Sequence, residues 1–229
     1  MPVSNTHARI ETQDRLLEAA LQAFGNRDYD GVSTREIVEK AEANISAISY
    51  HFGSKKGLYL ATVAYLADRL HAGMAEQLEQ IRQHAEVASP HQCAESLCRF
   101  LLHFLENMLL GEVGKHAPGI IFREQSQPTD AFEILYDKLL APMHGTLARL
   151  VARYRGLQAT DQAVIIMVHA LIGQTMIFRI GRTTFLRRMG TPAFDAANLE
   201  AVKRQLRHYY MAILNTTPDS INTDIPHDA

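Results

Sequence analysis

The chain has 229 residues, which is enough for one or two domains with a substantial buried core. Its formal net charge is only −2, so overall charge does not indicate a nucleic-acid partner. The sequence shows neither an uninterrupted apolar run of about 18 residues nor a hydrophobic signal core at its start, so we expect no membrane span and a cytoplasmic location.

Helical periodicity dominates the sequence and strand-like alternation is not convincing, so we predict an all-α fold. Three short helices are expected first, over 12–26, 33–40 and 44–52. Thr12, Ser33 and Asn44 are suited to capping the first turns of these helices. Gly53 then interrupts the helical pattern before a longer segment begins.

Six further helices, about nine in total, are expected over 55–83, 90–110, 119–126, 129–154, 160–181 and 195–215. Pro142 lies inside one of them and should bend or split it. Segment 183–192 is predicted to be a loop, and the polar tail 217–229 to be disordered. Cys93 and Cys98 fit neither a CxxC motif nor a zinc knuckle, and we predict that both are buried free thiols.

The second and third helices, joined by a short turn, predict a helix-turn-helix. Ile48 should pack against the first two helices. The residues expected to face outward are small or polar: Ser46, Ala47, Ser49 and Tyr50. Such a face lets a helix enter the major groove of DNA, where either serine could contact base edges and an Ala or Ser side chain could lie on a thymine methyl group.

Phosphate contacts are expected on both sides of this helix. Tyr50 and His51 can donate hydrogen bonds to phosphate oxygens, and Lys55 starts the next helix, whose free N–H groups favour an anion. Because residues 1–70 carry eight Lys or Arg and nine Asp or Glu, we expect modest non-specific affinity with strong salt sensitivity. The predicted DNA-contacting residues are Thr34, Arg35, Asn44, Ile45, Ser46, Ala47, Ser49, Tyr50, His51 and Lys55.

Residues 12–58 resemble the DNA-binding domain of the TetR family of transcription repressors. The resemblance rests on Leu16-Leu17-x-x-Ala20, on Ser33-Thr-Arg-Glu-Ile37, and on Ile48-x-x-His51-Phe52-x-x-Lys55-x-x-Leu58. The family usually has Gly-Val-Ser where this chain has Glu42-Ala43-Asn44, but Asn caps a helix as well as Ser does. Segments 122–128 and 169–174 are similar to the CecR-like branch, so the resemblance covers nearly the whole chain except the tail.

The resemblance implies a helix-turn-helix domain over 1–54 and a helical effector-binding and dimerisation domain over 55–216. Helices 160–181 and 195–215 would form a homodimer interface, unless the first is simply a core helix. The dimer would bind operator DNA as a repressor and release it on binding a small organic effector. Candidate effector-lining residues are Phe100, Phe104, Met108, Phe122, Arg123, Met143, His144, His169 and Gln174, although Arg123 and Glu124 could instead form a structural ion pair.

Two other classes of protein remain as alternatives. An enzyme would need catalytic signatures, and the sequence has no GxSxG motif, phosphate-cradling glycine loop or Cys/His arrangement. A helical ligand-binding or adaptor protein would have no reason to place Tyr50, His51 and Lys55 where phosphates would lie. The histidines are scattered without HxxxH spacing, so we expect no metal site, and we expect no cofactor.

Overall fold

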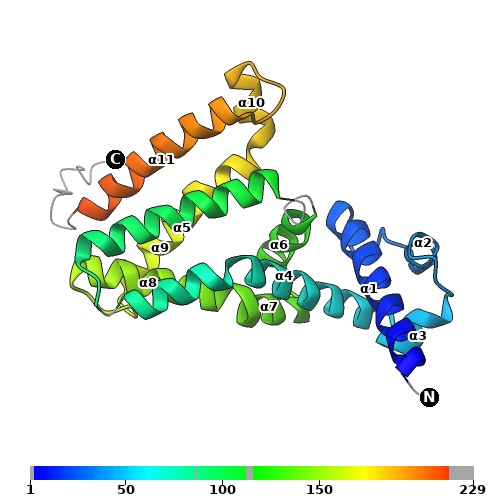
Figure 1. Cartoon of the computed structure of the whole chain (residues 1–229). Coiled ribbons are helices and arrows are strands. Elements are labelled where there is room, and N and C mark those ends of the chain that lie inside the picture. Colours follow the sequence, from blue (N-terminus) through cyan, green and yellow to red (C-terminus); the bar gives the residue numbers. More distant parts are fainter. Residues whose placement is uncertain (1–2, 86, 112–115, 217–229) are drawn as a thin grey trace, which may run out of the picture. The chain divides into compact units, whose positions relative to one another are not determined.

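The computed structural model describes residues 3–85, 87–111 and 116–216, and every regular element in this part of the chain is a helix (Figure 1). The elements are α1 (Val3–Asn26), α2 (Thr34–Lys40), α3 (Ser46–Phe52), α4 (Lys55–His84), α5 (Pro90–Leu110), α6 (Ala117–Ser126), α7 (Asp130–Leu135), the π-helical η2 (Tyr136–Leu140), α8 (Ala141–Arg155), α9 (Gln162–Ile180), α10 (Arg182–Met189) and α11 (Ala196–Asn215). The predicted all-α fold is confirmed. The predicted disorder of the tail 217–229 lies outside the described residues.

The chain divides into two compact units. Unit 1 comprises residues 1–80 and 107–144, and unit 2 comprises 81–106 and 145–229. The expected boundary between residues 54 and 55 falls inside unit 1, which holds α6 and α7 together with the helix-turn-helix. The division into a DNA-binding domain over 1–54 and an effector domain over 55–216 therefore stays a prediction about function.

The N-terminal end of unit 1 is organised by local capping and a small apolar core. The Ser33 hydroxyl accepts from the Arg35 N–H at 3.2 Å and starts α2, as predicted. Phe24, Ile37 and Ile48 are buried, so α1, α2 and α3 share one core. The predicted start of the first helix was wrong, since α1 begins at Val3 and Thr12 lies within it. Val3–Glu11 contains neither Pro nor Gly to stop the helix from extending.

Pro142 changes the helix around it, as predicted, and the structure shows how. Segment 129–154 is divided into α7, the π-helical turn η2 and α8. A proline has no N–H to donate to the carbonyl four residues earlier, and its ring clashes there in a regular α-helix. The wider π turn immediately before Ala141 lets the helix continue through the proline.

Unit 2 contains α9, α10 and α11 together with most of α5 and α8. Arg207 donates to both carboxylate oxygens of Glu95 at 2.6 and 2.7 Å, which fixes α11 beside α5 (Figure 1). The buried Thr175 and Tyr210 hydroxyls lie 2.7 Å apart and join α9 to α11. The two cysteines are free and buried, as predicted, and burial raises the pKa of the Cys98 thiol to about 11.

The predicted loop over 183–192 was wrong, because α10 occupies Arg182–Met189. Gly181 precedes this helix, and Gly190 closes it in a left-handed conformation with φ 69°. Phe185 packs between Phe178 and Phe194, at ring-centroid distances of 5.2 and 5.5 Å. Tertiary packing of this aromatic ring therefore supports a short helix whose paired threonines favour a loop when read alone.

Candidate nucleic-acid interface

The outer surface of α3 is exposed and uncharged. Tyr50 is 71% exposed and Ile45, immediately before the helix, is 53% exposed. Asn44, Ser46 and Ser49 are also exposed, whereas Ala47 and His51 are half-buried. At the start of α2, Arg35 is exposed and Thr34 is half-buried. The structure therefore places the predicted outward-facing residues of α3 on one accessible surface while Ile48 holds the opposite side in the core.

Asn44 fixes the start of α3. Its Oδ1 accepts from both the backbone N–H and the hydroxyl of Ser46, each at 3.0 Å, and its carbonyl accepts from the Ala47 N–H at 2.9 Å. Asn44 thus closes the turn that leads into α3, close to the capping role that the sequence predicted, although the helix itself begins at Ser46 and Ile45 is the residue at its N-cap position. Since the Ser46 hydroxyl donates to Asn44, its oxygen remains available as an acceptor.

The start of α4 is held close to the end of α3. The Ser54 hydroxyl accepts from the Gly57 N–H at 3.0 Å and caps α4. A Cβ at Gly57 would lie 2.0 Å from the carbonyl oxygen of Phe52, so only glycine fits this approach. Of the two lysines that follow Ser54, Lys56 forms an exposed ion pair with Asp130 at 2.5 Å.

Lys55 is positioned by an aromatic ring. Its ammonium lies 4.5 Å from the centroid of the Tyr29 ring, within range of a cation–π interaction. The Tyr29 ring packs edge-on against the Tyr59 ring at 5.3 Å, and Phe24 packs on both. Lys55, the predicted phosphate contact, therefore lies against Tyr29. Tyr29 is one of three packed aromatic rings, which come from α1, the α1–α2 connection and α4.

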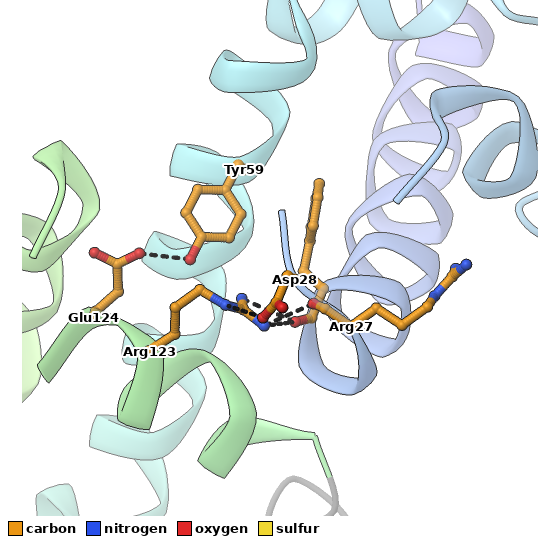
Figure 2. A network of polar contacts seen from close by, with 6 residues as sticks. Arg27, Asp28, Tyr59, Arg123 and Glu124 are labelled. Atoms are coloured by element: carbon orange, nitrogen blue, oxygen red, sulfur yellow. Dashed lines mark hydrogen bonds and ion pairs between the residues drawn. The ribbon is translucent and has the colours of Figure 1, made fainter. Parts of the chain in front are cut away.

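Figure 2 shows how α6 joins this cluster. The Tyr59 hydroxyl donates to Glu124 Oε1 at 2.6 Å, while Glu124 Oε2 accepts from the Thr129 N–H at 3.1 Å and the Thr129 hydroxyl at 2.8 Å. Glu124 is completely buried. Burial, followed by this hydrogen bond, raises the pKa of Tyr59 to about 12, which keeps the hydroxyl protonated as a donor.

The neighbouring Arg123 caps the end of α1 (Figure 2). Its two terminal nitrogens each donate to the Phe24 carbonyl at 3.1 Å, and one also donates to the Arg27 carbonyl at 2.6 Å. A guanidinium satisfies helix carbonyls that otherwise lack donors and complements the negative end of the helix dipole. Nearby, a Cβ at Gly119 would lie 2.0 Å from the Gly25 carbonyl oxygen, so the α1 and α6 backbones touch directly.

The predicted effector residues lie in both units. Unit 1 holds Met108, Phe122, Arg123, Met143 and His144, and unit 2 holds Phe100, Phe104, His169 and Gln174. Phe122 is 60% exposed and Met143 is buried, while Phe100 stacks on Phe104 at 6.5 Å. The Gln174 Oε1 atom is buried without a hydrogen-bond partner, which is the type of polar atom a ligand can satisfy.

Sequence reasoning missed Tyr29, Tyr59 and the roles of Arg123 and Glu124. In place of the alternative ion pair between Arg123 and Glu124, the guanidinium is directed to α1 and the carboxylate to Tyr59 and Thr129. Among the described residues, no group of three or more His, Cys, Asp or Glu is arranged to hold a metal ion.

A capped recognition helix with an exposed small polar face, an adjacent cation and an all-helical body define a helix-turn-helix DNA-binding protein. Comparison with known proteins specifies the class further. Residues 16–62 match the family model of bacterial regulatory proteins of the tetR family, and residues 93–217 match the C-terminal domain of the HTH-type transcriptional dual regulator CecR.

Individual relatives agree with these matches. The chain is 34% identical to the HTH-type transcriptional dual regulator CecR of Shigella flexneri, over 89% of this chain and 92% of the relative. A putative TetR-family transcriptional regulator from Mesorhizobium loti has the same fold, with a TM-score of 0.62, 20% identity, and coverage of 90% of this chain and 96% of that one. The chain belongs to the TetR family and is a transcription regulator, not an enzyme.

Proposed function

We propose that this chain is a homodimeric repressor that binds a near-palindromic operator in the cytoplasm and is released by a small organic effector. The observation that carries the proposal is the capped, exposed α3 in a unit that also contains α6, where Arg123 joins α6 to α1 and Glu124 joins it to α4. The predicted DNA contacts are retained as proposed roles: Thr34, Arg35, Asn44, Ile45, Ser46, Ala47, Ser49, Tyr50, His51 and Lys55.

The exposed surface of α9 supports the dimer. Ile165, Ile166, Ile177 and Ile180 are each more than half exposed, and only one residue of this 19-residue helix, Arg179, is charged. By length and composition alone α9 could cross a membrane, with 28% of its most apolar window buried. Because this family consists of soluble DNA-binding regulators, we propose that a second copy of the chain covers this surface of α9. We propose that α11 forms part of the same dimer interface.

The coupling of effector to DNA is proposed to act through α6. Because Arg123 and Glu124 are adjacent, a displacement of α6 pulls on the end of α1 and on Tyr59 together. Tyr59 in turn packs against the ring that positions Lys55. We therefore assign Arg123 a positioning role in place of effector contact, and we keep the other eight residues as effector candidates.

Reciprocity tests the effector part of this function. The first step identifies neutral, drug-sized organic compounds that raise the melting temperature of the purified protein. These compounds are then tested for their ability to release a bound operator duplex from the protein. If a compound weakens duplex binding by some factor, saturating duplex must weaken the compound's binding by the same factor. Compounds that bind tightly without changing duplex affinity in either direction would contradict effector control.

The phosphate contacts are tested by the salt dependence of DNA binding. We expect Tyr50→Phe combined with Lys55→Ala to weaken binding to every duplex sequence. The slope of log affinity against log salt should fall by about 2 per dimer, since each Lys55 ammonium lost from a phosphate removes about 0.9, whereas the Tyr50 hydroxyl is uncharged and leaves the slope unchanged. Lys56→Ala is the matched control, because Lys56 is paired with Asp130. An unchanged slope in the double variant would remove Lys55 from the phosphate contacts, and an unchanged affinity would remove both residues.

A further inference from the structure

The isoleucine that precedes α3 is exposed and held in one place. Ile45 has helical backbone angles, φ −58° and ψ −33°, and the hydrogen bonds of Asn44 to Ser46 and Ala47 close the turn around it. Ile48, three residues later, is buried and anchors the helix in the core, whereas Ile45 precedes the first helical residue and remains exposed. Ile45 is therefore presented to solvent on a fixed backbone, which is unlike an isolated apolar residue on a surface loop.

The surroundings of Ile45 restrict what it can contact. Its exposed neighbours on this surface, Asn44, Ser46 and Ser49, are polar and uncharged. Residues at the N-terminal end of a recognition helix are the ones that meet base edges. The apolar feature of the major groove is the C5-methyl group of thymine, whereas the other groups along the base edges are hydrogen-bond donors and acceptors.

We propose that Ile45 is a specificity-determining residue that packs on the C5-methyl group of one thymine in each operator half-site. This inference rests on the proposed function, in which α3 reads DNA. Ser46, whose hydroxyl donates to Asn44, faces the groove as an acceptor and so pairs with an amino group of adenine or cytosine. Ile45 thus selects thymine by shape, and Ser46 contributes the polar contact beside it.

Replacing thymine by deoxyuridine tests this inference, since the exchange removes one methyl group and leaves the hydrogen-bonding groups in place. An operator duplex selected with the wild-type protein is synthesised with each thymine of both half-sites replaced in turn. At one symmetric pair of positions, wild-type affinity is expected to fall about fourfold for one half-site and about 15-fold for both, the size expected for burying one methyl group. The same replacement leaves the affinity of Ile45→Ala unchanged.

A conservative variant serves as the control. Ile45→Val retains a β-branched apolar surface and keeps the preference for thymine over deoxyuridine. If every deoxyuridine effect persists at full size in Ile45→Ala, the role of Ile45 is refuted while sequence-specific binding by the chain stands. If no duplex can be selected with the folded wild-type protein, both the proposed function and this inference fail.

Discussion

Glu124→Ala is expected to lower the free energy of unfolding by about 2 to 4 kcal/mol, measured by denaturant or thermal unfolding. Glu124 is completely buried and accepts three hydrogen bonds, from the Tyr59 hydroxyl and from the N–H and hydroxyl of Thr129. Alanine leaves the buried Tyr59 hydroxyl without an acceptor and also loses the contact that holds Thr129 at the start of α7. The large cost arises because a buried donor is left unpaired, not because one bond is lost.

Glu124→Gln is the matched control for that change. Its amide oxygen can accept both donors of Thr129, and its amide nitrogen can donate to Tyr59, whose hydroxyl then accepts and leaves only its own O–H unpaired. We therefore expect a smaller loss than in the Ala variant, about 1 to 2 kcal/mol, because a hydrogen bond to each partner residue is kept. An Ala variant as stable as the wild type, or a Gln variant as damaging as Ala, would show that these hydrogen bonds do not hold α6 to α4.

Ile166→Arg combined with Ile177→Arg is expected to give a folded monomer whose operator affinity falls by a factor of roughly 100 or more. Both side chains are more than half exposed on α9. In the proposed dimer, two guanidinium groups per chain would be buried against the same face of the partner, where like charges repel and are poorly solvated. A monomer contacts only one half-site, so it loses the gain in affinity that comes from linking two DNA-binding helix-turn-helix units in one dimer.

The measurements are the mass in solution, either the chain mass of 25.7 kDa or twice that value, and the dissociation constant for an operator duplex. Val87→Arg is the matched control, because Val87 is a strongly exposed apolar residue outside α9 and α11. The double variant should be monomeric and the control dimeric. A double variant that remains a dimer would place the interface elsewhere.

Local structure near the DNA-binding surface was the part best predicted from the sequence. Ser33 and Asn44 act on their own helix ends, so short-range capping rules identify them. Pro142 disturbs its own helix for an equally local reason. Short-range rules failed at α10, where the packing of Phe185 between Phe178 and Phe194 outweighs the loop preference of Thr183 and Thr184.

The hydrogen bonds that join α6 to α1 and α4 could not be predicted, because the residues that form them are far apart in the sequence. Arg123 contacts carbonyls almost 100 residues earlier, and Tyr59 contacts a carboxylate 65 residues later. Tyr59 lies between Leu58 and Leu60 in the sequence, and this position does not show where its hydroxyl points. The sequence did contain a signal for this region, since segment 122–128 is similar to the CecR-like branch of the family. The structural role of the segment could be identified only from the folded chain.

The central claim is that α3 reads a DNA sequence from a symmetric dimer, and selection of bound duplexes from a random library tests it most directly. The purified wild-type protein is used at about physiological salt, after its folding and dimer mass have been verified. The expected result is enrichment of a near-palindromic site whose half-sites are about one helical turn, or a multiple of it, apart. No enrichment from folded, dimeric protein, with or without the compounds that stabilise it, would contradict the claim that residues 33–52 read DNA.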